Sequence, residues 1–255
     1  MLRPKNNKTK PRIKHRPFLK WAGGKFRLTD DLNRVFPKRK QCLIEPFVGA
    51  GAVFLNSHFE RYILADINPD LINLFNIVKE NVDAYIEACK PIFFAENANT
   101  AEYYYAQRDA FNQSTDPFDR SVLFLYLNRF GFNGLCRYNS KNEFNVPFGA
   151  YKTHYFPEDE LRYFAHKAQS AVFLCADFQQ TFELADKHSV IYCDPPYAPL
   201  PQDTNFTGYA GNAFSLEHQK NLAECAKKAQ KEKQISVVIS NHDTKFTREI
   251  YKGAK

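Results

Sequence analysis

The segment SVIYCDPPY, residues 189–197, carries the most specific chemical signal in the sequence. An apolar, β-branched run leads into Asp194, and Pro195, Pro196 and Tyr197 follow directly. Two prolines fix φ and remove two N–H donors, which makes a rigid corner lined by carbonyl oxygens. An exocyclic aromatic amine needs acceptors for both N–H bonds before its lone pair can attack a methyl group. Asp194 and the Pro195 carbonyl can be those acceptors, and Tyr197 can stack on the aromatic base that carries the amine.

A second signal is the glycine-containing loop in LIEPFVGAGAVF, residues 43–54. A predicted strand runs into Gly49 and Gly51 and then into a helix, so a ligand can approach the backbone and the free N–H groups of the helix. Asp66 ends the next predicted strand, where a carboxylate can bind the ribose of a nucleoside cofactor. Each feature also fits an ordinary turn or helix cap, so the loop alone does not identify a cofactor site.

Short apolar runs bounded by turn residues must position these side chains. They lie at 42–45, 62–66, 172–176, 190–194 and 235–240. Helical patterns separate most of them, and this alternation predicts a doubly wound, mostly parallel, Rossmann-like α/β sheet. Ligands bind at the carboxyl ends of the strands in such sheets, which is where Asp66 and Asp194 stand.

Residues 85–169 interrupt this pattern with aromatic, Asn-rich and Arg-bearing sequence. The segment is too long for a crossover loop and predicts an inserted domain, largely helical. We expect helices over 100–112 and 119–128, and a hairpin that turns near 140–142. Residues 18–84 and 170–255 would then form the catalytic domain.

Composition bounds the remaining possibilities. The 255 residues are 44% hydrophobic, enough for a sizeable core, and the six cysteines form neither a C-x-x-C pair nor a metal-ligand cluster. We therefore expect a soluble, cytoplasmic, monomeric protein with no metal and no membrane span. The net charge of +7 lies in residues 1–17, which hold seven basic residues and no acid. This basic arm can bind phosphates or be a disordered tail.

Motifs from Phe18 onward together resemble the Dam-type, D12-class DNA adenine methylases. In chain order they are FLKWAGGK (18–25), EPFVGAGAVF (45–54), ADIN (65–68), LNRFGFNGLCRYN (127–139), FNVPFG (144–149), CDPPYAPL (193–200) and VVISNHD (237–243). The resemblance implies methyl transfer from S-adenosylmethionine to adenine N6 in double-stranded DNA at 5′-GATC-3′, with base flipping and direct in-line transfer. It also implies a role in mismatch-repair strand marking, replication control and gene regulation, or as the partner of a restriction nuclease.

The resemblance assigns residues to two sites. Trp21 and Lys25 would contact the cofactor over the Gly49–Gly51 loop, Asp66 the ribose, and Asp177 and Phe178 the cofactor adenine, while Asp194 would lie beside the transferred methyl group. Residues that would contact the DNA site are Lys20, at the outer guanine, and Asn133, Leu135, Arg137, Pro147 and Tyr151 from the inserted domain. Phe132 would insert into the duplex and fill the stack that the flipped base vacates. An arginine can pair with guanine O6 and N7, but Arg137 can also be a phosphate clamp, and Phe132 can be a core residue.

Two departures from the family pattern stand out. Ala150 replaces a basic residue that relatives carry after FG, and the chain ends at Lys255 where the family continues. We therefore expect the C-terminal strands of the sheet to be missing.

Three alternatives remain. The chemistry also suits methylation of cytosine N4 or of a protein glutamine, although those families carry Ser or Asn at the Asp194 position. A DNA-binding protein without turnover would keep the recognition segment. An NAD-dependent dehydrogenase is disfavoured because Phe54 stands where G-x-G-x-x-G requires its third glycine.

Overall fold

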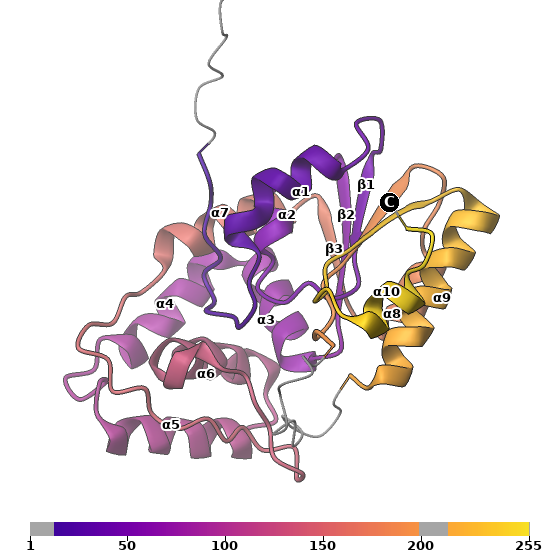
Figure 1. The fold of residues 1–255 in the computed structure, drawn as a ribbon. Coiled ribbons are helices and arrows are strands. Elements are labelled where there is room, and N and C mark those ends of the chain that lie inside the picture. The colour runs from indigo at the N-terminus through magenta and orange to yellow at the C-terminus, as the bar shows by residue number, and fades with distance from the viewer. Residues whose placement is uncertain (1–12, 199–213, 255) are drawn as a thin grey trace, which may run out of the picture.

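A five-stranded parallel sheet forms the centre of the molecule (Figure 1). The computed structural model describes residues 13–198 and 214–254. Within them the strands run in the spatial order β3-β2-β1-β4-β5. Their bounds are β1 (Cys42–Glu45), β2 (Arg61–Asp66), β3 (Ala171–Cys175), β4 (Ser189–Cys193) and β5 (Ser236–Ile239). The predicted α/β sheet is confirmed, and each strand end lies within one residue of its predicted position.

Helices cover both faces of the sheet, which explains why its central strands are apolar at successive positions. Leu43 packs into one hydrophobic cluster with Leu64 and Tyr192, whereas its neighbour Ile44 packs into a second cluster with Ile191. The first face carries α1 (Thr29–Val35), α2 (Ala52–Asn56), α3 (Pro69–Glu80) and α7 (Glu158–Ala168). The other side carries α8 (Phe178–Glu183), α9 (Leu216–Lys233) and α10 (Lys245–Ile250) (Figure 1). A short 3₁₀ turn, η1 (Phe26–Leu28), precedes α1.

The segment between α3 and α7 forms the second part of the molecule (Figure 1). It contains α4 (Val82–Phe93), α5 (Ala101–Gln113), α6 (Pro117–Phe130) and the 3₁₀ turn η2 (Phe132–Gly134). The predicted helices correspond to α5 and α6. The expected hairpin consists of isolated antiparallel bridges, Tyr138 with Phe144 and Gly131 with Phe148, and Asn142 takes a positive φ of 61° at its turn. Residues of α5 and α6 share one hydrophobic cluster with α3 and α7, so the two parts have a continuous core.

Lys14 and His15 of the expected basic arm contact the body of the protein. Lys14 forms an ion pair with Asp30 at 2.8 Å. The His15 ring stacks on Tyr163 with 3.4 Å between centroids, and its backbone N–H donates to Asn56. The rest of the arm, residues 1–12, lies outside the described residues.

Candidate active site

A cavity of about 1020 Å³ lies at the carboxyl ends of β1, β2, β3 and β4. The predicted residues that line it are Trp21, Lys25, Gly49, Asp66, Asp177, Phe178, Asp194, Pro195, Pro196 and Tyr197. Of the predicted cofactor residues, Gly51 alone is not part of the lining. Gly51 instead forms the N-cap of α2, where its φ of 74° lets the chain turn from the loop into the helix. The volume suits a ligand of nucleoside size.

Asp194, the residue after β4, forms a buried ion pair with Lys25. The Lys25 Nζ lies 2.7 Å from Asp194 Oδ2, and the side chains are 9% and 19% exposed. The same Nζ donates to the Gly23 carbonyl at 2.6 Å and lies 4.8 Å from the centroid of the Tyr197 ring. The other carboxylate oxygen, Asp194 Oδ1, is buried and has no hydrogen-bond partner among the described residues. Burial raises the pKa of Asp194, while Lys25 opposes the shift.

Glu45, the last residue of β1, places a second carboxyl in the cavity wall. It is 2% exposed, and its Oε1 has no partner within the described part of the chain. Burial raises the pKa of Glu45 well above its usual range, and the neighbouring charge of Asp194 raises it further. Glu45 is not among the residues expected from the sequence, although, like Asp66, it is an acidic residue at the end of a buried strand.

Asp66 holds the glycine loop beside the cavity. Its Oδ2 accepts the N–H of Gly49 at 3.2 Å, and its Oδ1 accepts the N–H of Asn68 at 3.0 Å. Gly49 has a φ of 49°, and a Cβ there would lie 2.9 Å from Nε1 of Trp21. The indole therefore packs directly on the loop backbone, and only glycine fits between them. Burial raises the pKa of Asp66, against the effect of its backbone hydrogen bonds.

Aromatic rings form another wall of the cavity. Phe178 stacks on Phe47 with 5.7 Å between centroids and 25° between the planes, and Phe214 meets Phe47 edge-on at 5.4 Å. Such a wall suits a planar heterocycle. Asp177 caps α8, and its Oδ1 accepts the N–H of Gln179 at 2.8 Å. The sequence reasoning missed Phe47, which lies within the glycine-loop motif.

Two elements brace the Asp-Pro-Pro-Tyr corner from outside the cavity. Gln219 in α9 donates to the Pro196 carbonyl at 2.7 Å and accepts from Asn241 Nδ2 at 2.8 Å. Asn241 Oδ1, beyond β5, accepts the N–H of Ala198 at 3.1 Å. The Pro196 carbonyl is therefore bonded to the scaffold, which leaves the Pro195 carbonyl as the candidate second acceptor. Asn241 belongs to the VVISNHD motif, but no sequence signal pointed to Gln219.

Lys20 connects the cavity segment to the predicted DNA-contacting residues. Its Nζ donates to the Arg129 carbonyl at 2.9 Å and lies 3.8 Å from the centroid of the Tyr151 ring. The Tyr151 hydroxyl accepts the N–H of Asn133 at 2.7 Å. Burial lowers the pKa of Lys20 to about 8, and the charge of Arg129 adds to the shift. The structure thus brings Lys20, Asn133 and Tyr151 together.

The remaining predicted DNA-contacting residues lie along the adjoining chain. Phe132 is 47% exposed, so the alternative of a core residue is wrong. The Phe132 N–H donates to the carbonyl of Pro147, and Pro147 is itself exposed to solvent. Leu135 and Arg137 are half-buried, and Arg137 Nε donates to Asn145 Oδ1 at 2.8 Å. Arg137 is therefore held across the hairpin by Asn145.

The described residues offer neither a metal cluster nor a membrane span. In residues 13–198 and 214–254, no three His, Cys, Asp or Glu side chains gather in a way that could hold a metal ion. No helix in those ranges has the length and apolarity to cross a bilayer. All six cysteines are free.

Comparisons with known proteins agree on one family. The family model for D12 class N6 adenine-specific DNA methyltransferases matches residues 21–255. A DNA adenine methylase of Haemophilus influenzae is 81% identical over the whole chain, which covers 89% of that relative. DNA adenine methylases of Vibrio cholerae and Escherichia coli K12 are each 60% identical over 95% of the chain, which covers 87% and 86% of them. The family expected from the motifs is therefore confirmed: the chain belongs to the D12 class of N6 adenine-specific DNA methyltransferases.

Proposed function

We propose that this adenine-N6 DNA methyltransferase acts on adenine within 5′-GATC-3′ in double-stranded DNA, with S-adenosylmethionine as its methyl donor. The observation that carries the proposal is the position of Asp194. Its carboxylate lies at the end of β4 in the same cavity as the Gly49 loop and the Phe47–Phe178 wall. A surface that can bind a nucleoside and two groups that can accept from an amine therefore share one cavity.

The cavity residues fit the proposed methyl donor. The Phe47–Phe178 wall can hold an adenine ring, and Asp66 can accept from ribose hydroxyls. The Trp21 indole, which packs on Gly49, forms another part of the cavity surface. S-adenosylmethionine would supply an electrophilic methyl group. The residues of the chain bind it, orient it and exclude water from it.

Asp194 and the Pro195 carbonyl orient the amine to be methylated. Asp194 Oδ2 is held by Lys25, so the buried and unpartnered Oδ1 is the atom left to accept an N–H of adenine N6. Tyr197 stacks on the flipped base, close to the Lys25 ammonium. Because N6 is paired inside the duplex, base flipping is required, and the exposed Phe132 ring can fill the vacated stack.

Recognition of GATC would fall to two groups of residues. Lys20, Asn133 and Tyr151 form one group, which adjoins the cavity through the segment that carries Trp21. Leu135 and Arg137 lie on the hairpin, where an apolar side chain can contact a thymine methyl and an arginine can pair with guanine. The exposed surface of Pro147 adjoins Phe132 through their hydrogen bond.

A plasmid assay tests the proposal. The protein is incubated with S-adenosylmethionine and unmethylated plasmid, which is then digested with one nuclease that cuts only methylated GATC and another that cuts only the unmethylated site. With the wild-type protein, we expect the plasmid to become sensitive to the nuclease that cuts methylated GATC and resistant to the nuclease that cuts the unmethylated site. Asp194→Ala should lose on the order of 10²–10³-fold in rate, because an oriented acceptor in the reacting site is removed. Asp31→Ala, which changes a carboxylate that is 64% exposed, is the matched control and should switch normally.

The other outcomes separate the alternatives. GATC-selective binding without any switch would favour a DNA-binding protein without turnover. Methyladenine found by mass spectrometry outside GATC would keep the reaction but overturn the proposed sequence. Methylcytosine would overturn the proposed orientation of the base at Asp194.

A further inference from the structure

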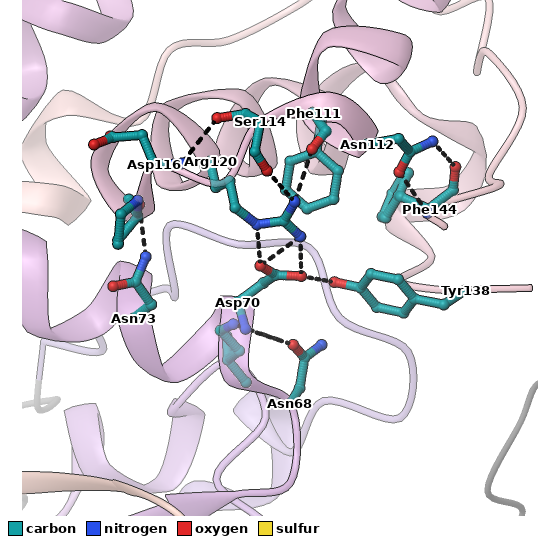
Figure 2. Close-up of polar contacts among 12 residues, drawn as sticks. Asn68, Asp70, Asn73, Phe111, Asn112, Ser114, Asp116, Arg120, Tyr138 and Phe144 are labelled. Carbon is teal, nitrogen blue, oxygen red and sulfur yellow. Dashed lines mark hydrogen bonds and ion pairs between the residues drawn. The ribbon is translucent and has the colours of Figure 1, made fainter. Parts of the chain in front are cut away.

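A partly buried hydrogen-bond network joins the first turn of α3 to the hairpin that carries Arg137 (Figure 2). Asp70 is the second residue of α3, and Asn68 caps the helix by accepting the N–H groups of Asp70 and Leu71 at 3.0 and 3.2 Å. Asn68 also donates its N–H to Asp66. The backbone of Asp70 is therefore fixed by the same turn that presents Asp66 to the cavity.

Arg120 in α6 orients the Asp70 carboxylate. Its Nε donates to Oδ1 at 2.9 Å and its Nη2 to Oδ2 at 3.0 Å, while its Nη1 donates to the carbonyls of Phe111 and Ser114 at 2.8 and 2.9 Å. The guanidinium also lies 4.1 Å from the centroid of the Phe111 ring. Since all three nitrogens of Arg120 donate within the fold, this arginine serves as scaffold and not as a phosphate clamp.

The two neighbours of Arg137 are bonded to this turn. The Tyr138 hydroxyl donates to Asp70 Oδ2 at 2.6 Å, and Cys136 Sγ accepts from Asn68 Nδ2 at 3.3 Å. Burial raises the pKa of Tyr138 far above its usual range, so the hydroxyl keeps its proton and remains a donor. Both contacts lie on the α3 side of the hairpin.

Arg137 itself bonds across the hairpin. Its Nε and Nη2 donate to the side-chain and main-chain oxygens of Asn145, at 2.8 and 3.2 Å. Successive side chains of an extended segment point in opposite directions, which agrees with the different partners of Tyr138 and Arg137. On the second strand, Asn112 of α5 accepts the N–H of Phe144 at 2.8 Å and donates to its carbonyl at 3.1 Å. The hairpin is therefore attached to the helices on both of its strands (Figure 2).

We propose that Tyr138, held by Asp70, is a positioning residue that sets the specificity of base recognition by Arg137. This inference rests on the proposed recognition of GATC. A bidentate contact with guanine requires both guanidinium donors to meet O6 and N7 in the plane of the base. The Tyr138–Asp70 bond fixes the backbone next to Arg137 without belonging to the surface that meets the bases. Its loss lets Arg137 adapt to other bases, so discrimination falls more than the rate on the cognate site.

Tyr138→Phe tests this directly because it keeps the ring and removes only the hydroxyl. The matched control is Tyr85→Phe, which removes a buried hydroxyl that donates at 2.9 Å to the Ser121 carbonyl of α6 and not to Asp70. The ratio of kcat/KM on a GATC duplex to kcat/KM on duplexes with the guanine pair replaced is measured for both variants and the wild type. We expect Tyr138→Phe to lower this ratio about tenfold, and Tyr85→Phe to leave it at the wild-type value.

The comparison separates a positioning role from a merely structural one. Thermal melting of the two variants measures how much stability each loses with its hydroxyl. If the Tyr138 hydroxyl were merely structural, Tyr138→Phe would lose stability as Tyr85→Phe does and would keep the wild-type ratio. A Tyr138→Phe protein that keeps the wild-type ratio, whatever its melting temperature, overturns this inference and leaves the proposed function intact. A wild-type enzyme that methylates all duplexes equally overturns the proposed recognition of GATC, and this inference with it.

Discussion

Asp194 and Glu45 are carboxyls at the ends of adjacent strands, β4 and β1, and burial raises the pKa of both, but beside Asp194 the ammonium of Lys25 opposes the shift. Lys25 lies 2.7 Å from Asp194 and stabilises the ionised form. Glu45 is 2% exposed and has an unpartnered Oε1, so burial favours its protonated form. In its protonated form Glu45 adds no second negative charge beside the Lys25–Asp194 ion pair. Under the proposed function, the ion pair with Lys25 favours an Asp194 carboxylate that can accept from the amine.

Glu45→Gln should make stability less dependent on pH. The pKa of Glu45 is raised on folding, so its favourable contribution is fully present below the unfolded-state pKa and is lost as pH rises through the folded-state value. Relative to Glu45→Gln, the wild type should lose up to about 1.4 kcal/mol of unfolding free energy per pH unit above roughly pH 4.3. Denaturant unfolding from pH 5 to 8 measures this difference, with Glu60→Gln at an exposed position as the control for net charge. Parallel stability curves for Glu45→Gln and the wild type would contradict it.

At the scale of elements, α9 and the segment after β5 hold the Asp-Pro-Pro-Tyr corner in place. Gln219 is 1% exposed and bonds both the Pro196 carbonyl and Asn241. The strands themselves could be predicted because apolar runs and turn residues are local signals. The Gln219 contact could not be predicted, since it depends on how α9 packs against a corner distant in the sequence.

Gln219→Ala should therefore lower kcat more than it raises KM. Removal of the amide leaves the Pro196 carbonyl and the Asn241 amide without their partner, at a cost of about 1–3 kcal/mol in stability. A small displacement of the corner should reduce kcat by roughly 10- to 100-fold, because the reacting groups lose their alignment. Steady-state kinetics below the melting temperature measure both constants. Gln230→Ala, at an exposed position of the same helix, is the control. A normal kcat for Gln219→Ala would show that the corner keeps its shape unaided.

Across the whole molecule, the sheet order gathers residues that are far apart in the chain. Asp66 ends β2, Asp177 and Asp194 come shortly after β3 and β4, and all three line one cavity because parallel strands end at the same edge. That edge was predictable from strand pattern and acidic residues. The contact of Lys20 with Tyr151 was not, because the family motifs gave both residues a role in DNA contact but no mutual geometry. The continuous core of the two parts likewise depends on three-dimensional packing.

A cavity built from several strands should couple ligand binding to the stability of the whole fold. At 100 times its Kd, S-adenosylmethionine should add about 2.7 kcal/mol to the unfolding free energy, which corresponds to a rise in Tm of roughly 5–10 °C for a chain of this size. Trp21 is the only tryptophan and lines the cavity, so its fluorescence reports the site while far-UV circular dichroism reports the helices and strands.

The two signals should melt together and shift together, because the described cavity is lined by residues at the ends of four strands of one sheet. NAD at the same concentration is the control, since the loop lacks the third glycine of a dinucleotide site and should give no shift. A shift with NAD but none with S-adenosylmethionine would overturn the proposed methyl donor. A shift seen only in fluorescence would instead mean that the cavity orders locally, without coupling to the strands whose ends compose it.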